Sequence, residues 1–398
     1  MSVSQPESAL RVAPLPLQPF RWASILSVAF YYRLPYRIRG WGGLPRRRGP
    51  TLLIANHQHE IESAVLISDL TIATISWRYP IFTVSSRRMW EPGFFAERIP
   101  WLSPVLRMRK FGWLFSSLGL QPIENELHER PFVSVAYTLQ GLHGELEVAN
   151  VFSESARARL PKSVSRVGDL LSAQHFAVGR TRVKLTEVLE PYRKEILQQT
   201  RTQLEADLQH FENLQRAGST IFLAPEGFYS GDGKMQRLRG SLSRLAPLAE
   251  IWLAGISYDP FVGRRLSMLY RIGKAEPNLA LDLQLKRIRP VTTSALLGTW
   301  LHERGERAFT AREAQHAIEA ALAALPSVLF VEPELRGNPA RLTQRALHGL
   351  LQLDIAELDA GTYRLKRNRT HPQFPRTPDI IEYLYNFHHE TLDGANAA

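Results

Sequence analysis

The chain has 398 residues, 44% of them hydrophobic, which is enough to bury a sizeable core in one large domain with additions. It contains no cysteine, so disulfides, a thiol nucleophile and a cysteine-ligated metal are excluded, and a cytoplasmic setting fits. The net charge of +11 favours anionic partners such as nucleic acid, anionic lipid or a phosphorylated cofactor. Because no zinc-finger or helix-turn-helix motif is present, we expect lipid and cofactor partners and no nucleic acid.

The N-terminal stretch combines aromatic side chains with positive charge. Its apolar run, residues 20–32, is shorter than the roughly 20 residues that span a bilayer. No small-residue cleavage site follows this run, so a signal peptide is not predicted either. The first 50 residues hold eight arginines and one acidic residue. This composition favours an interfacial helix lying on an anionic membrane, and the alternative is a helix packed on the core with a basic outer face.

The next segment has the densest group of polar side chains. A buried strand is predicted over residues 51–55, and a polar turn and a helix follow it. The turn carries His57, His59, Glu60 and Glu62. Inside one helix, His57 and Glu62 would diverge by about 140°. They can meet only if His57 precedes the helix and Glu62 lies in its first turn, which the strand-turn-helix arrangement provides.

Several interpretations of this turn stay open. An imidazole held by a carboxylate is the usual general base for a hydroxyl, and ligands of open α/β folds bind at the carboxyl edge of the sheet. In a purely structural interpretation, one histidine caps the helix and the glutamates are solvated acids of its first turn. His57 and His59 beside an acid would also suit a metal-dependent hydrolase. No further histidine or aspartate cluster follows at a useful spacing, so we predict no metal.

The middle of the chain is harder to interpret. A strand is predicted over residues 81–86, and the arginines and aromatic residues that follow it suit a surface for an acyl chain and lipid headgroups. A core whose arginines snorkel to the surface is the alternative. Residues 126–218 exceed what a strand-helix crossover needs, so we expect an insertion there that ends in a long helix over 186–217.

A second strand and turn follow the insertion. The apolar run 220–224 leads into Pro225, Glu226 and Gly227, and a glycine-rich segment comes next, with a helix predicted after Gly240. The arrangement therefore repeats that of the first strand and turn.

Together, the two turns resemble the conserved blocks of the glycerolipid acyltransferases, the 1-acylglycerol-3-phosphate and lysophospholipid acyltransferase family. Asn56, His57 and Glu62 match the block N-H-x-x-x-x-D, with Glu in place of Asp. Residues 224–230 occupy the block F-P-E-G-T-R-S, and Asp232-Gly233 and Arg239-Gly240 continue it. The resemblance implies an α/β fold with a mixed, mostly parallel central sheet flanked by helices, an αβα sandwich.

The resemblance also implies a reaction. A fatty acyl group would pass from a thioester donor, acyl-CoA or acyl carrier protein, to a hydroxyl of a glycerol-phosphate or lysophospholipid acceptor in phospholipid biosynthesis. No cofactor would be bound permanently. His57 would act as the base and Glu62 would orient its ring. The expected substrate-binding residues are Asn56, Glu226, Gly227, Ser230, Lys234 and Arg239.

Two positions depart from the family. Asn125 and Tyr229 stand where the family has arginines that are associated with the phosphate of the acceptor. Other cations near these blocks are candidates to compensate: Arg130, Lys234, Arg237 and Arg239. The alternatives are an acceptor without an exposed phosphate, such as a neutral lysolipid or an amino-lipid, and a catalytically idle lipid-binding relative.

The rest of the chain completes the sheet and then changes character near residue 291. Strands are predicted over 251–258 and 266–273, and helices over 312–324, 339–358 and 378–392. We divide the chain into an interfacial segment (1–40), an α/β domain with its insertion (41–290) and a helical C-terminal appendage (291–398). The expected location is the cytoplasm, peripherally on the inner face of the membrane, with the phospholipid surface as a partner.

Overall fold

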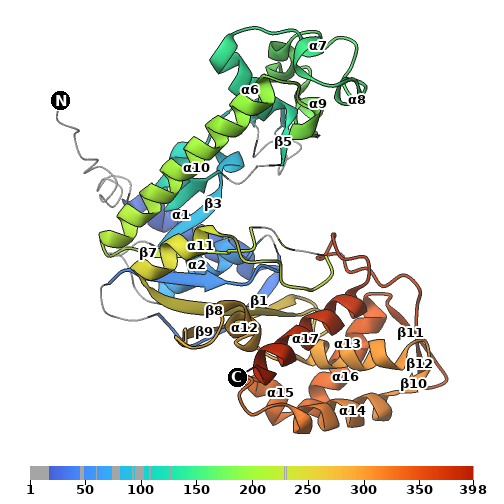
Figure 1. Cartoon of the computed structure of the whole chain (residues 1–398). Helices are drawn as coiled ribbons and strands as arrows, with labels where there is room; N and C mark the ends of the chain where they lie inside the picture. The colour runs from blue at the N-terminus through green and yellow to red at the C-terminus, as the bar shows by residue number, and fades with distance from the viewer. Residues whose placement is uncertain are drawn as a thin grey trace. The chain divides into compact units, whose positions relative to one another are not determined.

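The computed structural model describes residues 18–44, 49–59, 61–73, 81–91, 94, 103–106, 109–124, 128–227, 229 and 231–397 (Figure 1). Glu60, Asn125 and Ser230, which the sequence analysis singled out, lie outside these residues. Contacts between Cα atoms divide the chain into one unit of Met1–Thr83 with Leu214–Ala398 and a second of Val84–Asn213. This division differs from the boundaries predicted from composition.

The central sheet has seven strands in the order β1-β9-β8-β2-β7-β3-β4. Its strands are β1 (Tyr36–Trp41), β2 (Thr51–Ala55), β3 (Ile81–Ser86), β4 (Leu120–Ile123), β7 (Thr220–Leu223), β8 (Glu250–Asp259) and β9 (Leu266–Lys274). β2 is parallel to β7 and β8, β7 is parallel to β3, β1 is parallel to β9, and β8 is antiparallel to β9. The predicted α/β class with a mixed, mostly parallel sheet flanked by helices is therefore confirmed.

β2 lies at the centre of this sheet. All its residues are buried, as expected for a continuous apolar run with neighbours on both sides. Its Ile54 is in register with Leu223 of β7 and Leu253 of β8. Because these three strands are parallel, the turns that follow β2 and β7 start at the same edge of the sheet. The register thus brings together the two segments that the sequence analysis singled out.

The helices of the first unit are α1 (Gln18–Arg33), α2 (Glu62–Ala73), α11 (Ser241–Leu245), α12 (Leu281–Arg287), α13 (Thr293–Arg304), α14 (Ala311–Ala324), α15 (Pro333–Gly337), α16 (Pro339–Gln352) and α17 (Ile380–Asn396). α1 packs on α2 and buries Ile25 and Ala29, but Phe30 and Tyr31 are 69% and 65% exposed. In the part of the chain that the structure describes, no helix has both the length and the apolar character needed to cross a bilayer.

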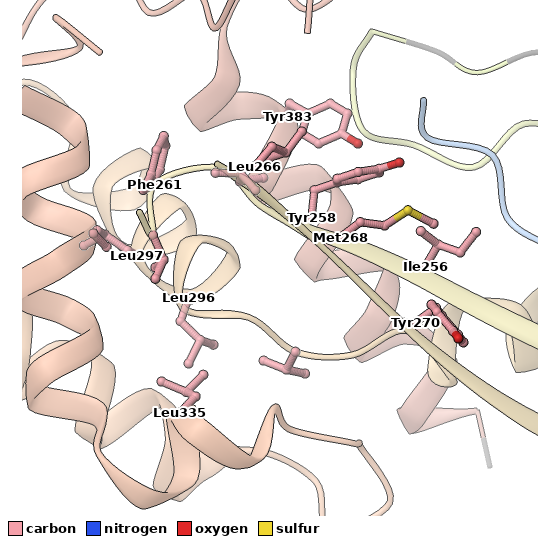
Figure 2. Packing of buried hydrophobic residues seen from close by; sticks show 14 of the residues in the cluster. Ile256, Tyr258, Phe261, Leu266, Met268, Tyr270, Leu296, Leu297, Leu335 and Tyr383 are labelled. Atoms are coloured by element: carbon pink, nitrogen blue, oxygen red, sulfur yellow. The ribbon is translucent and has the colours of Figure 1, made fainter. Parts of the chain in front are cut away.

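The C-terminal helices share a core with the sheet. α17 packs on α12 and α13, and one hydrophobic cluster joins Tyr258 of β8, Met268 of β9, Leu297 of α13 and Tyr383 of α17 (Figure 2). Residues of the predicted appendage are therefore part of the packing that supports β8 and β9.

The C-terminal region is also not purely helical, which corrects the prediction. α16 ends at Gln352, before the predicted limit of 358, and the chain continues as β11 (Ala356–Asp359) and β12 (Thr362–Leu365). These strands form an antiparallel sheet with β10 (Phe309–Thr310). The turn between them places Ala360 and Gly361 at φ values of 46° and 82°, the left-handed conformation that a two-residue hairpin turn requires. Alanine is a weak signal for such a turn, so the hairpin was missed.

The second unit has a hydrophobic cluster of its own, which includes Phe132, Leu139, Phe152 and Val183. Its helices are α4 (Ser103–Leu106), α5 (Gly112–Ser117), α6 (Phe132–His143), α7 (Val148–Val151), α8 (Glu154–Arg157), α9 (Phe176–Gly179) and most of α10 (Tyr192–Arg216). Two short strands, β5 (Glu129–Pro131) and β6 (Arg182–Lys184), pair in antiparallel fashion. The excursion after β4 is therefore a packed structure rather than a loop.

Candidate active site

His57 lies between the end of β2 and the start of α2, and its ring is held by Glu62. The distance from Nδ1 of His57 to Oε2 of Glu62 is 2.8 Å. Because a carboxylate only accepts hydrogen bonds, this contact keeps a proton on Nδ1 and leaves Nε2 able to accept one. Among the described residues, none forms a hydrogen bond with Nε2. The geometry is the predicted one, with His57 before the helix and Glu62 as its first residue.

Glu62 is itself fixed in place. Its side chain is 3% exposed, and both of its carboxylate oxygens accept from the backbone N–H of Gln58, at 2.8 and 2.9 Å. The carboxylate also sits at the first residue of α2, where the helix dipole favours negative charge. The side chain of His57 is 18% exposed. A buried carboxylate therefore faces one edge of an imidazole that still reaches the surface.

A second glutamate holds the backbone of His57. Oε1 of Glu226 accepts from the N–H of His57 and Oε2 accepts from the N–H of Gln236, both at 2.7 Å. Burial raises the pKa of Glu226 to about 7, although these two hydrogen bonds act in the opposite direction. Glu226, which follows β7, therefore joins the two turns through one side chain.

The pKa of His57 reflects both glutamates. Burial by itself would lower it, since the charged imidazolium loses solvation. The hydrogen bond to Glu62 and the negative charges of Glu62 and Glu226 outweigh this effect, so the pKa of His57 is raised above its ordinary value of 6.5.

Asn56, predicted as a substrate-binding residue, is placed inside the sheet. Its Nδ2 donates to the carbonyl of Ile256 at 3.0 Å, and its Oδ1 accepts from the N–H of Ile256 at 2.6 Å. The side chain is fully buried. Asn56 therefore ties the end of β2 to β8, just before the residue that carries the imidazole.

The side chain of Arg239 packs closely against the backbone of the second turn at Gly227. Gly227 has a φ of +78°, and a Cβ there would lie 2.2 Å from Nε of Arg239. Nε of Arg239 is 3.4 Å from the carbonyl oxygen of Glu226, and burial lowers the pKa of this guanidinium. No carboxylate of the described residues forms an ion pair with Arg239. Arg239 is thus a half-buried cation near His57.

Four backbone amides of the glycine-rich segment donate to groups within the protein. The N–H groups of Gly227, Lys234, Met235 and Gln236 donate to Ala224, Asp232, Glu390 and Glu226, respectively. The side chain of Lys234 is exposed on this segment. Among the predicted cations, Arg239 contacts the backbone of Glu226 and so lies at the site.

His59 is held by backbone groups. Its Nε2 donates to the carbonyl of Gln373 at 2.7 Å, and its Nδ1 accepts from the N–H of Ile61 at 3.4 Å. Both ring nitrogens therefore have protein partners. Within the described ranges, no group of three or more histidine or acidic side chains is arranged to hold a metal ion.

Two C-terminal residues that no motif predicted also reach the site: Arg376, which precedes α17, and Tyr383, which lies in α17. The guanidinium of Arg376 lies 4.5 Å from the ring centroid of Tyr229, whose ring is 5.4 Å from that of His57. The Tyr383 hydroxyl also donates to the side chain of Gln58. No local sequence pattern predicts these residues, because they reach the site only through tertiary contacts of the C-terminal region.

Comparisons with known proteins give no independent evidence on the chemistry of this site. No protein-family model matches the chain, and no curated protein sequence matches it. The site is therefore interpreted from its own geometry at one edge of the sheet. It holds a histidine whose Nε2 has no hydrogen-bond partner among the described residues, two buried glutamates and two nearby guanidinium groups.

Proposed function

We propose that the protein is an acyltransferase that moves a fatty acyl group from a thioester donor to a hydroxyl of a glycerol-phosphate or lysophospholipid acceptor. The observation that carries the proposal is the 2.8 Å contact between Nδ1 of His57 and Glu62, which leaves Nε2 as a base at the carboxyl edge of β2. The resemblance of the two turns to the blocks of the glycerolipid acyltransferases supports this reaction class.

In the proposed reaction, Nε2 of His57 removes the proton of the acceptor hydroxyl as the oxygen attacks the thioester carbonyl. The carbon–sulfur bond then breaks, and the thiolate leaves with the proton that His57 received. Glu62 stabilises the imidazolium between these steps, as its position on Nδ1 allows. The acceptor is itself the nucleophile, so the chemistry needs no acyl-enzyme and no permanently bound cofactor. Acyl-CoA and acyl carrier protein are both suitable donors.

We also propose that the enzyme works peripherally on the inner face of the membrane. Leu26, Phe30 and Tyr31 of α1 are 52%, 69% and 65% exposed, and the chain carries a net charge of +11. Exposed apolar side chains on a positively charged protein suit an anionic lipid surface, where a lysolipid acceptor resides.

The test is transfer of a labelled acyl group from acyl-CoA, and separately from acyl carrier protein, to a panel of acceptors. The panel contains glycerol 3-phosphate, lysophosphatidic acid, neutral lysolipids and amino-lipids. His57→Ala should lower turnover by about 10³-fold or more, as expected when a general base is lost. His348→Ala, which removes an exposed histidine of α16, is the matched control and should leave turnover unchanged.

Other outcomes distinguish the alternatives. Activity that survives His57→Ala contradicts the mechanism. Ester hydrolysis that a chelator abolishes would favour the metal-dependent hydrolase that uses His57 and His59. No transfer with either donor, together with retained lipid binding, would favour the idle lipid-binding relative.

A further inference from the structure

The segment before α17 is built into the candidate site. The carbonyl of Gln373 accepts from His59 at 2.7 Å, and the ring of Phe374 lies 5.6 Å from that of His59. The Tyr383 hydroxyl donates to Gln58. The turn after β2 therefore contacts both this segment and α17, and these contacts fix the segment next to His57.

The same segment and α17 pack against the turn after β7. A Cβ at Gly231 would lie 1.9 Å from the carbonyl oxygen of Arg376, so this close approach requires a glycine. Nδ2 of Asn386 donates to the carbonyl of Asp232 at 2.9 Å. Both turns that shape the candidate site thus depend on residues from the C-terminal region.

The guanidinium of Arg376 contacts an aromatic ring that itself contacts His57. Its guanidinium lies 4.5 Å from the ring centroid of Tyr229, a geometry that orients a planar cation on an aromatic face. The ring of Tyr229 is 5.4 Å from that of His57. The positive charge of Arg376 acts on His57 by lowering its pKa, which partly offsets the two glutamates. The ring of Tyr229 therefore contacts both a guanidinium and the proposed base.

Arg239 contacts the same turn at other residues. It contacts Glu226 and Gly227, whereas Arg376 contacts Tyr229. A guanidinium binds phosphate through two parallel hydrogen bonds, and two such groups beside a base would bind an anion next to the reacting hydroxyl.

We propose that Arg376 binds the phosphate of the acceptor and thereby selects a phosphate-bearing acceptor over a neutral one. The inference rests on the proposed acyl transfer. It assigns to the C-terminal region a direct part in substrate specificity, through a residue far in sequence from both turns.

The test compares Arg376→Ala and Arg376→Lys with Arg367→Ala, which removes the same charge from an exposed position on the preceding stretch. KM and kcat are measured for lysophosphatidic acid and for monoacylglycerol. Arg376→Ala should raise KM for lysophosphatidic acid by about 10- to 100-fold, the range for loss of a charged hydrogen-bond pair, with little change in kcat. KM for monoacylglycerol should not change. Arg376→Lys should fall between the wild type and Arg376→Ala, because it keeps the charge and loses the fork.

Acyl-CoA also carries phosphate groups, so Arg376 could bind the donor instead of the acceptor. The KM for acyl-CoA is therefore measured beside the KM for lysophosphatidic acid. A rise in KM for acyl-CoA without a rise for lysophosphatidic acid would overturn the proposal, since Arg376 would then bind the donor. Equal changes for both acceptors, or no change, would also overturn it.

Binding is measured separately from turnover, so that failure of the proposed function remains distinguishable. Glycerol 3-phosphate is titrated into each variant while the imidazole signals of His57 are followed by NMR. A shift of these signals in the wild type and in Arg367→Ala that is absent in Arg376→Ala supports the phosphate site even if no acyl transfer is found. No binding to the wild type, or equal binding to Arg376→Ala, overturns it. Without ligand, Arg376→Ala should raise the pKa of His57, because a nearby positive charge is lost.

Discussion

The turns after β2 and β7 each supply a buried glutamate to His57, but the two glutamates hold different parts of it. Glu62 is five residues away in sequence and binds the ring, whereas Glu226 is 169 residues away and binds the backbone. The first contact sets which ring nitrogen carries the proton. The second sets where the ring is. Glu62 should therefore affect turnover and Glu226 should affect stability, and these two expectations can be tested.

The largest effect is expected from Glu62→Gln. A carboxamide cannot stabilise the imidazolium, so kcat should fall by about 10³-fold, equivalent to about 4 kcal/mol. Glu62→Asp keeps the charge at a longer distance and should lose less activity. Steady-state kinetics, with unfolding curves of the same proteins, measure both effects. Equal losses of kcat in the two variants would contradict the orienting role of Glu62.

Asn56→Ala should act on stability instead. It leaves the buried N–H and C=O of Ile256 without their side-chain partner, which should lower the free energy of unfolding by roughly 2–4 kcal/mol. Denaturation in urea measures this loss. If stability stayed unchanged while KM for the acceptor rose, Asn56 would be a substrate-binding residue, as the motif resemblance predicts.

Glu226→Gln should have a smaller effect on stability and should change its pH dependence. The carboxamide nitrogen cannot accept a hydrogen bond, so one of the N–H groups of His57 and Gln236 loses its acceptor at a cost of about 1–3 kcal/mol.

The sign of the pH effect follows from the raised pKa of Glu226. Its pKa is about 7 in the folded protein against an ordinary value of 4.5, so the folded state binds more protons between these values. Wild-type stability therefore loses a contribution from Glu226 as the pH rises from 4.5 to 7. Glu226→Gln should remove this loss, and unfolding curves across the range measure it. An unchanged slope would show that Glu226 is ionised throughout.

The smallest effect is expected in the pH profile of turnover. His57 must be neutral to act as a base and its pKa is raised, so kcat/KM should rise with pH and level off above the ordinary value of 6.5. In Glu62→Gln the negative charge that raises this pKa is lost and the hydrogen bond is no longer to an ionised group, so the midpoint should move to lower pH. A midpoint that moves to higher pH would contradict the assignment of Glu62 as the partner of the ring.

Local patterns in the sequence determined much of this protein. The apolar run of β2 gave the strand at its observed limits, and β7 and β8 lie within a residue or two of their predicted ends. The spacing of His57 and Glu62 predicted their meeting correctly, because a turn followed by the first helical residue leaves few other geometries. Gly227 was singled out as part of a turn, and its positive φ explains why a glycine is there.

The tertiary structure alone decided which distant residues meet at His57. Glu226 was expected in the site, but its bond to the backbone of His57 depends on the register of β2 with β7. The partner of Asn56 is Ile256, and the cation on Tyr229 is Arg376. Hydrophobic periodicity in the sequence indicates which side chains share a face of one helix or strand. Contacts between elements arise from the packing of the sheet and the C-terminal helices in one core, and no local pattern specifies them.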